Sequence, residues 1–227
     1  MSLFADLKNR GFAASDPFGS FVSGLEAFND VRKQLGTPRV FSWLKTTEDD
    51  SINLVESKQS TARKFGDIWH QDHAYEQDPP RYTILLSELI PRDGGETKFV
   101  CRRKIASKVS RKERERLKSG KFLISPPENA VTSSLERGIS LNSRTSTGIS
   151  SRDGHDVMEL SPYHTPIDSK QDELHWLSKI YSVYDSLSET VTWQPNMLVV
   201  WDNFRVFHKA INNYGDQHRR MFRSIID

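Results

Sequence analysis

Five short, strand-like runs dominate this chain and limit the folds that it can adopt. They cover residues 39–44, 82–89, 96–101, 197–201 and 219–226. Apolar residues recur with a helical period in two stretches, at about residues 20–36 and 169–187. Because short strands with few helices bury their apolar faces by stacking two sheets, we expect a mainly β fold. A sandwich or jelly roll with helices on one side fits this pattern.

Both apolar helices are expected to pack on the core. The first ends near Gly36, and its apolar face consists of Phe21, Leu25, Phe28, Val31 and Leu35. The second begins near the capping candidates Asp168 and Ser169, and its face consists of Leu174, Leu177, Ile180, Tyr181 and Tyr184. Two further segments are polar. Residues 102–117, dense in Lys and Arg, predict a solvated helix. Residues 125–154, rich in Ser, Thr, Gly and Asn, predict a structureless loop that forms a flexible lid.

The size and charge of the chain point to one domain without a general attraction for polyanions. Its 227 residues, 36% hydrophobic and 27% charged, suit a single unit over residues 1–227. A formal net charge of +2 gives no global field to recruit nucleic acid or an anionic membrane. No apolar run of about 18 residues is present to span a bilayer, and no signal-type apolar segment opens the sequence. We therefore expect a soluble, cytoplasmic protein. The sequence allows a homo-oligomer but does not decide the oligomeric state.

Three residues from two distant motifs form a candidate metal site. Cys101 is the only cysteine, so that any metal must be held by His, Asp or Glu. His70 and Asp72 are two positions apart, and an extended strand would present both on one face. His208 follows an apolar strand and a turn near the other end of the chain. Two imidazoles and one carboxylate leave three positions open on the ion, which is typical of non-haem Fe(II) oxygenases.

Two arginines can supply the cation that a 2-oxoglutarate-dependent oxygenase needs for the far carboxylate of its co-substrate. Arg219 and Arg223 are four positions apart, so that both point the same way from an extended segment. A guanidinium offers a carboxylate two parallel hydrogen bonds, which an ammonium cannot. Arg220 alternates with Arg219 and should point away from the site.

These motifs resemble the TauD/TfdA family, the taurine and 2,4-dichlorophenoxyacetate dioxygenases and their relatives. The first matching block comprises residues 69–72 (Trp-His-Gln-Asp), 79–80 (Pro-Pro) and 94–97 (Gly-Gly-Glu-Thr). The second comprises residues 193–196 (Trp-Gln-Pro-Asn) and 201–203 (Trp-Asp-Asn), with His208, Arg219 and Arg223. The resemblance implies a double-stranded β-helix, a jelly roll of cupin-like type.

The resemblance also implies roles for six residues. His70, Asp72 and His208 match the iron ligands, while Thr97 and Arg219 match residues that bind the distal carboxylate of 2-oxoglutarate. Arg223 matches an arginine near the co-substrate and the anionic end of the substrate. The implied enzyme uses Fe(II), 2-oxoglutarate and O2, hydroxylates a small polar anionic or zwitterionic metabolite such as an amino acid, and releases succinate and CO2. Taurine itself is disfavoured, because the N-terminal positions that hold it have no recognisable counterpart.

Three other functions stay open from the sequence alone. A jelly roll can be a binding protein without chemistry, since fold does not determine function. Zinc accepts two histidines and a carboxylate, so that a zinc hydrolase is a second alternative. A nucleic-acid demethylase is a third, favoured only by the basic run at residues 102–118. His73 and His164 match no ligand position and are expected on the surface or in a supporting position near the site.

Overall fold

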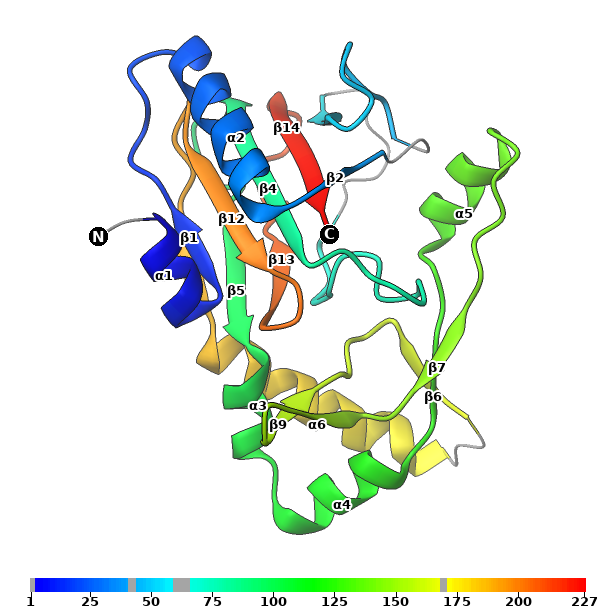
Figure 1. Cartoon of the computed structure of the whole chain (residues 1–227). Coiled ribbons are helices and arrows are strands. Elements are labelled where there is room, and N and C mark those ends of the chain that lie inside the picture. The colour runs from blue at the N-terminus through cyan, green and yellow to red at the C-terminus, as the bar shows by residue number, and fades with distance from the viewer. Residues whose placement is uncertain (1–2, 41–43, 59–65, 168–170) are drawn as a thin grey trace.

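Two facing antiparallel sheets form the body of the computed structural model, which describes residues 3–40, 44–58, 66–167 and 171–227 (Figure 1). The larger sheet has the order β1-β12-β4-β14-β2, with β3 also paired to β14. Its strands are β1 (Phe12–Ala14), β12 (Leu198–Asp202), β4 (Tyr82–Leu89), β14 (Arg219–Ile226), β2 (Pro38–Arg39) and β3 (Asn53–Ser57). The smaller sheet consists of β11 (Glu189–Val191), β5 (Thr97–Cys101) and β13 (Val206–Ala210), with β5 in the centre.

Alternation along the central strands gives the larger sheet two apolar faces. Ile84 and Leu86 of β4 pack with Phe28 of α2 (Phe21–Leu35), which covers the outer face in Figure 1. Leu85 points the opposite way and packs with Phe99 of the smaller sheet. Burial of each such side chain stabilises the fold by roughly 1.5–3 kcal/mol. The two sheets and α2 therefore form three layers, and the functional side chains lie between the sheets.

Helix α2 begins and ends where the sequence predicts. The Ser20 side chain accepts a hydrogen bond from the Ser23 amide, and the Gly36 amide donates to the Arg32 carbonyl. A Cβ atom at Gly36 would lie 2.3 Å from the Asp227 carbonyl oxygen, so that only glycine allows this close approach to the end of the chain.

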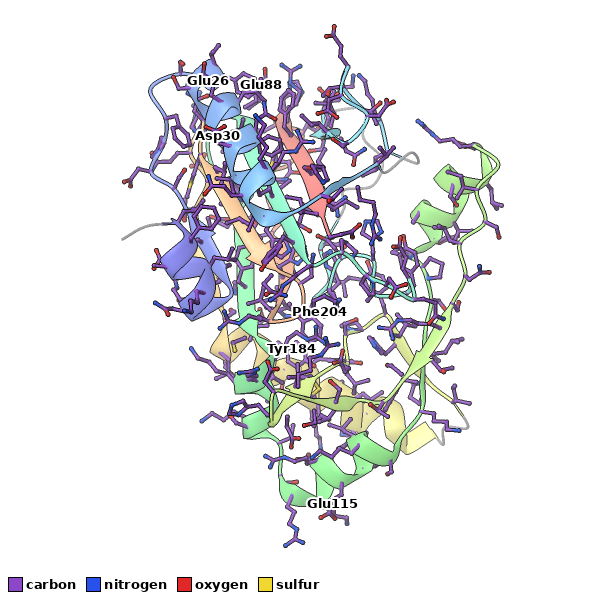
Figure 2. The ribbon with its side chains drawn as sticks, in the orientation of Figure 1. Glu26, Asp30, Glu88, Glu115, Tyr184 and Phe204 are labelled. Atoms are coloured by element: carbon purple, nitrogen blue, oxygen red, sulfur yellow. The ribbon has the colours of Figure 1, made fainter. Side chains whose placement is uncertain are left out.

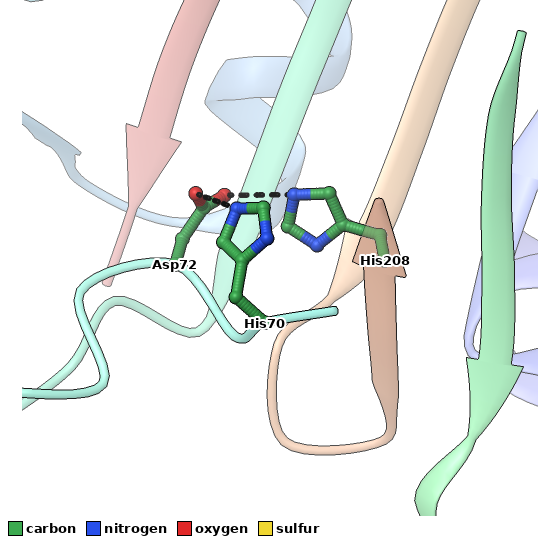
Figure 3. A group of neighbouring side chains, drawn as sticks. All are labelled: His70, Asp72 and His208. Atoms are coloured by element: carbon green, nitrogen blue, oxygen red, sulfur yellow. Dashed lines mark ion pairs between the residues drawn. The ribbon is translucent and has the colours of Figure 1, made fainter. Parts of the chain in front are cut away.

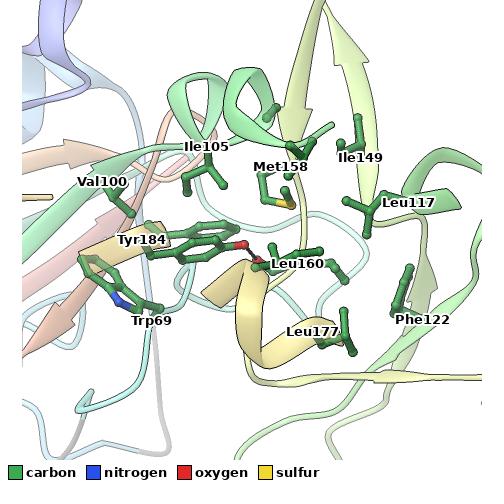
Figure 4. Close-up of a cluster of buried hydrophobic side chains, with 14 residues drawn as sticks. Trp69, Val100, Ile105, Leu117, Phe122, Ile149, Met158, Leu160, Leu177 and Tyr184 are labelled. Atoms are coloured by element: carbon green, nitrogen blue, oxygen red, sulfur yellow. Dashed lines mark hydrogen bonds between the residues drawn. The ribbon is translucent and has the colours of Figure 1, made fainter. Parts of the chain in front are cut away.

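Most of the remaining elements form a second, mixed half around one apolar cluster. They are α3 (Arg102–Lys108), α4 (Arg111–Ser119), α5 (Glu128–Leu135) and α6 (Gln171–Leu187), with strands β6 (Phe122–Ile124), β7 (Arg144–Ser146), β8 (Ile149–Arg152), β9 (His155–Met158) and β10 (His164–Pro166). Figure 4 shows Ile105, Leu117, Met158 and Tyr184 in that cluster, where the Tyr184 hydroxyl donates to the Leu160 carbonyl oxygen at 2.7 Å. In Figure 2, Tyr184 lies where this half meets the sheets, and Glu115 of α4 lies at its outer end. Helix α1 (Leu3–Arg10) lies outside this half, because it packs on β1 and its Leu7 belongs to the cluster around Phe28.

Most of the predicted elements are confirmed, and some of their bounds shift. The strands at residues 82–89 and 219–226 have the predicted bounds, and those at 96–101 and 197–201 move by one residue at one or both ends. The run at residues 39–44 is confirmed only at Arg39, where β2 ends, and is wrong at residues 40 and 44, which are not in a strand. Residues 41–43 lie outside the described residues. The second apolar helix is α6, but its capping candidates Asp168 and Ser169 also lie outside the described residues, as does the side chain of Leu174.

Two predictions from composition are wrong. Residues 125–154 are not a structureless loop, because they contain α5, β7 and β8. Residues 102–117 are not one solvated helix, since Ser110 and Glu113 form a capping box that starts a second helix, α4. The side chain of Arg102 is fully buried rather than solvated. None of the helices in the described part of the chain combines the length and apolarity that a bilayer span needs.

Candidate metal and co-substrate site

An antiparallel bridge between His70 and His208 sets the geometry of the site. The amide of each residue donates to the carbonyl oxygen of the other, at 3.0 Å in both cases. Residues paired in this way project their side chains on the same side, and the two imidazole centroids are 4.2 Å apart. The expectation of a strand through His70 and Asp72 is wrong, because only His70 is in a bridge and Asp72 lies in the following turn.

Asp72 completes a compact cluster of three donor groups (Figure 3). Its Oδ1 lies 3.8 Å from His70 Nε2, and its Oδ2 lies 3.9 Å from His208 Nε2. The ligand atoms of the three residues all lie within 4.8 Å of one another. The structure therefore brings together all three predicted ligands, which come from a loop and from β13.

Hydrogen bonds and burial hold the two imidazoles in the form that binds metals. His70 Nδ1 lies 2.7 Å from the Ile68 carbonyl oxygen, which can only accept, so that Nδ1 carries a proton and Nε2 is the nitrogen that faces Asp72. Burial, followed by the neighbouring charge at His70, lowers the pKa of His208 to about 3. His208 is therefore neutral at pH 7. Two imidazoles and a carboxylate fit a divalent cation such as Fe(II).

A chain of hydrogen bonds orients the Asp72 carboxylate. The Thr83 hydroxyl donates to Asp72 Oδ2 at 2.7 Å, and Asn203 Nδ2 donates to the Thr83 oxygen at 3.0 Å. Arg223 Nη2 lies 3.0 Å from Asp72 Oδ1. Burial raises the pKa of Asp72, but the charge of Arg223 and the nearby histidines outweigh it and hold the pKa far below the usual range. Asp72 is therefore an anion with a fixed orientation.

A cavity of about 450 Å³ opens beside the cluster. Its polar part includes the three cluster residues with Thr97, Arg219 and Arg223. Its apolar wall includes Leu54, Ala74, Tyr75, Ile124, Pro127, Ala130 and Tyr163. The volume lies within the range of small-molecule sites, roughly 300–1,000 Å³. All six residues predicted from the sequence therefore face one cavity.

Arg219 is a buried cation for which no acidic partner lies among the described residues. Its side chain is 7% exposed, and its Nε has no hydrogen-bond partner in that part of the chain. Burial lowers its pKa, but a guanidinium stays charged at pH 7. Thr97 lines the same cavity, and its oxygen accepts from Trp193 Nε1 at 2.9 Å, which leaves the hydroxyl proton available to another acceptor. A buried, unpaired cation beside a free hydroxyl donor suits a carboxylate ligand.

The neighbouring basic and imidazole residues have different surroundings. Arg220 points away from the cavity, as the alternation predicts, and its Nη2 lies 2.7 Å from a Glu88 carboxylate oxygen. His73 lines the cavity, with Nδ1 2.7 Å from a Glu76 carboxylate oxygen, whereas His164 is buried outside it. His73 is therefore in a supporting position near the site, which is one of the two predicted alternatives, and His164 is neither on the surface nor in the cavity wall.

Comparison with known proteins identifies the class of site. Residues 13–225 match the family described as taurine catabolism dioxygenase TauD, TfdA family. The chain belongs to the TauD/TfdA family. This family consists of 2-oxoglutarate-dependent dioxygenases whose cofactors are Fe(II) and 2-oxoglutarate, and the His-Asp-His cluster of this TauD/TfdA member fits the iron.

Individual relatives of this TauD/TfdA member are distant. It is 26% identical over 179 residues to an alpha-ketoglutarate-dependent sulfonate dioxygenase of Saccharomyces cerevisiae, a match that covers 71% of the chain and 43% of that protein. It is 25% identical over 202 residues to an alkylsulfatase of Acinetobacter baylyi, which covers 75% of the chain and 59% of that protein. The chain therefore spans about half the length of these relatives.

A solved structure confirms the fold. A taurine dioxygenase from Burkholderia xenovorans superposes with a TM-score of 0.76 at 17% sequence identity, and the match covers 98% of this chain and 79% of that chain. At this level of identity the likeness shows the fold alone. The jelly roll with flanking helices that the sequence predicts is therefore confirmed.

Proposed function

We propose that this chain is an Fe(II)- and 2-oxoglutarate-dependent oxygenase in which His70, Asp72 and His208 hold the iron. The observation that carries the proposal is the cluster itself, with the ligand atoms of two imidazoles and an anionic carboxylate within 4.8 Å of one another in the wall of a cavity. When bound, Fe(II) and 2-oxoglutarate would supply the electrons that activate O2, which is the oxidant of the substrate. A zinc hydrolase would not need a buried cation to bind a co-substrate. This site has such a cation in Arg219, which favours the oxygenase.

We further propose that Arg219 and Thr97 bind the distal carboxylate of 2-oxoglutarate. The guanidinium offers two parallel donors, and the Thr97 hydroxyl offers a third. Trp193 supports both, because its Nε1 donates to Thr97 and its ring centre lies 6.0 Å from the Arg219 guanidinium carbon. The carboxylate would relieve the cost of burying Arg219 without a partner.

Arg223 is proposed to serve both the metal site and the substrate. Its contact with Asp72 keeps the carboxylate ionised, and it lines the cavity next to the cluster. A substrate anion in the cavity would lie within reach of the same guanidinium. Arg223 would thereby place the reacting carbon of the substrate beside the iron without entering the reaction itself.

The proposed substrate is a small organic anion with an apolar body. The apolar wall of the cavity, formed by residues such as Tyr75, Ile124 and Pro127, suits a carbon chain or ring better than a second charged group. The two distant relatives are named for a sulfonate and an alkyl sulfate, both of which join an anionic head to a carbon body. Hydroxylation with release of succinate and CO2 is the proposed outcome.

A substrate panel tests this proposal. Linear alkanesulfonates, alkyl sulfates, carboxylates and amino acids are incubated with the protein, Fe(II), ascorbate and 2-oxoglutarate, and oxygenated product and succinate are quantified by mass spectrometry. We expect kcat/KM to rise roughly fourfold for each added methylene until the wall is filled, since each buried methylene contributes about 0.8 kcal/mol. Oxidation of free amino acids alone would contradict the apolar body, and hydrolysis without succinate would contradict the oxygenase.

Residues 125–154 are proposed to close over the bound substrate. Ser125, Pro127 and Ala130 line the cavity, and exposed residues follow at the end of α5. With Fe(II), 2-oxoglutarate and substrate bound, trypsin should therefore cut at Arg137 more slowly than in the free protein. Cleavage at Arg111, on α4 and outside the cavity lining, is the internal control. Equal rates at Arg137 in the free and fully bound protein would show that the segment does not respond to the site.

A further inference from the structure

Arg102 is a fully buried cation that does not line the cavity, yet it contacts the neighbours of the proposed iron ligands. It is the first residue of α3, and its side chain is 0% exposed. Its Nε donates to the Met158 carbonyl oxygen at 2.7 Å, and its Nη2 pairs with the Glu159 carboxylate. Its Nη1 donates to Gln71 Oε1 at 3.0 Å and to the Asn203 carbonyl oxygen at 2.9 Å.

The partners of Arg102 adjoin all three residues of the cluster. Gln71 lies between His70 and Asp72 in the chain, and its side chain is buried. Asn203 supports Asp72, since its Oδ1 lies 3.4 Å from the Asp72 amide nitrogen and its Nδ2 donates to Thr83. The Arg102 guanidinium carbon also lies 4.8 Å from the ring centre of Phe207, the residue before His208. One side chain therefore joins the ligand loop, the turn between β12 and β13, and β13 itself.

Glu159 holds Arg102 from the opposite side. Its Oε1 accepts a hydrogen bond from the Ser150 hydroxyl and lies 3.5 Å from Arg152 Nη2, and both of these residues belong to β8. Burying such a pair contributes little to stability compared with apolar residues of the same volume. The pair is better explained by the geometry that it imposes on its neighbours.

We propose that Arg102, held by Glu159, is a positioning residue that sets the spacing between the ligand loop and His208 and thereby tunes metal affinity. This inference rests on the proposed metal site. Partners of metal ligands orient them, and their loss commonly lowers metal affinity by about 10- to 100-fold. Gln71 is the link through which Arg102 acts on His70 and Asp72.

Two variants of the full chain, stripped of metal with a chelator, test the proposal by titration with Co(II). Gln71→Met removes the acceptor for Arg102 Nη1 at nearly constant volume and leaves the Arg102–Glu159 pair in place. Arg102→Met with Glu159→Leu removes both charges together, so that no buried charge is left without a partner. Tyr184→Phe is the matched control, because it removes a buried hydrogen bond to the Leu160 carbonyl oxygen but keeps the ring that stacks on Phe207 and every hydrogen bond of Arg102.

We expect both test variants to bind Co(II) at least about tenfold more weakly than the wild type, and the control to stay within about twofold. At saturating Co(II), the visible bands of Gln71→Met should also shift, because the ligands relax to a different geometry. A loss of stability alone would move neither the bands nor the affinity of the folded protein. Wild-type affinity in either test variant would overturn the proposal. Failure of the wild type to bind Co(II) would instead overturn the proposed function, and this inference with it.

Discussion

His208→Ala is expected to abolish 2-oxoglutarate decarboxylation that depends on substrate, and to weaken metal binding by more than about 100-fold. The imidazole is one of three protein donors, and even the residues that only orient such donors contribute about 10- to 100-fold. His70→Ala and Asp72→Asn should have effects of the same order, because the ligand atoms of all three residues lie within 4.8 Å of one another. Succinate formation at saturating Fe(II) and metal affinity by titration are the two measurements.

His164→Gln is the matched control for the metal site. His164 is 5% exposed and His208 is 7% exposed, and burial lowers the pKa of both to about 3. His164 does not line the cavity, and its Nδ1 accepts from the Ser161 amide. We expect the control to retain metal binding whatever its effect on stability. Near-normal turnover in His208→Ala, with the control unchanged, would end the assignment of the three ligands.

Arg219→Ala is expected to raise the Michaelis constant for 2-oxoglutarate by about one to two decades, since a hydrogen bond between charged groups contributes roughly 1.5–3 kcal/mol. Arg219→Lys should have a smaller effect, because an ammonium keeps the charge but loses the second parallel donor. The affinity for 2-oxoglutarate should also fall when it is measured by calorimetry on the metal-loaded protein without O2. Metal affinity should not change, because no hydrogen bond or ion pair joins Arg219 to the cluster within the described part of the chain.

Arg220→Ala is the control for this prediction, because Arg220 follows Arg219 on β14 and points out of the cavity toward Glu88. It should bind 2-oxoglutarate as the wild type does. Arg223→Ala should chiefly affect the substrate and the pairing of Asp72. Normal 2-oxoglutarate binding in Arg219→Ala, together with weak binding in Arg223→Ala, would show that the two arginines have exchanged roles.

The sequence predicts the sheets well because their strands are long or strongly apolar. Strands β4 and β14, at the centre of the larger sheet, have the predicted bounds. Strands β7 and β8 are three and four residues long and lie in a segment whose composition resembles a loop. So short a strand contains too little alternation to be recognised, although Ile149 is buried in the core. Composition alone therefore misreads residues 125–154.

The residues of the candidate site also differ in how well the sequence predicts them. Those with ligand chemistry can be recognised locally, whereas those that support the ligands depend on long-range contacts. Ligand chemistry points to His70, Asp72 and His208 as the proposed ligands, because two imidazoles and one carboxylate are the donor set typical of non-haem Fe(II) oxygenases. Residues that hold the ligands give no such signal. In the sequence, Arg102 looks like one of many solvated basic residues, because its partner Glu159 is 57 positions away and only the fold brings the two together. Thr83 is an ordinary strand residue until the fold brings it to Asp72.

Anaerobic addition of 2-oxoglutarate to the Fe(II)-loaded protein tests the central claim most directly. If the three residues hold iron and leave positions open for the co-substrate, a weak visible charge-transfer band should appear and saturate at about one equivalent. The band should be lost in Asp72→Asn and should need more 2-oxoglutarate in Arg219→Ala. A protein that binds Fe(II) but develops no band at any concentration of 2-oxoglutarate would contradict the account.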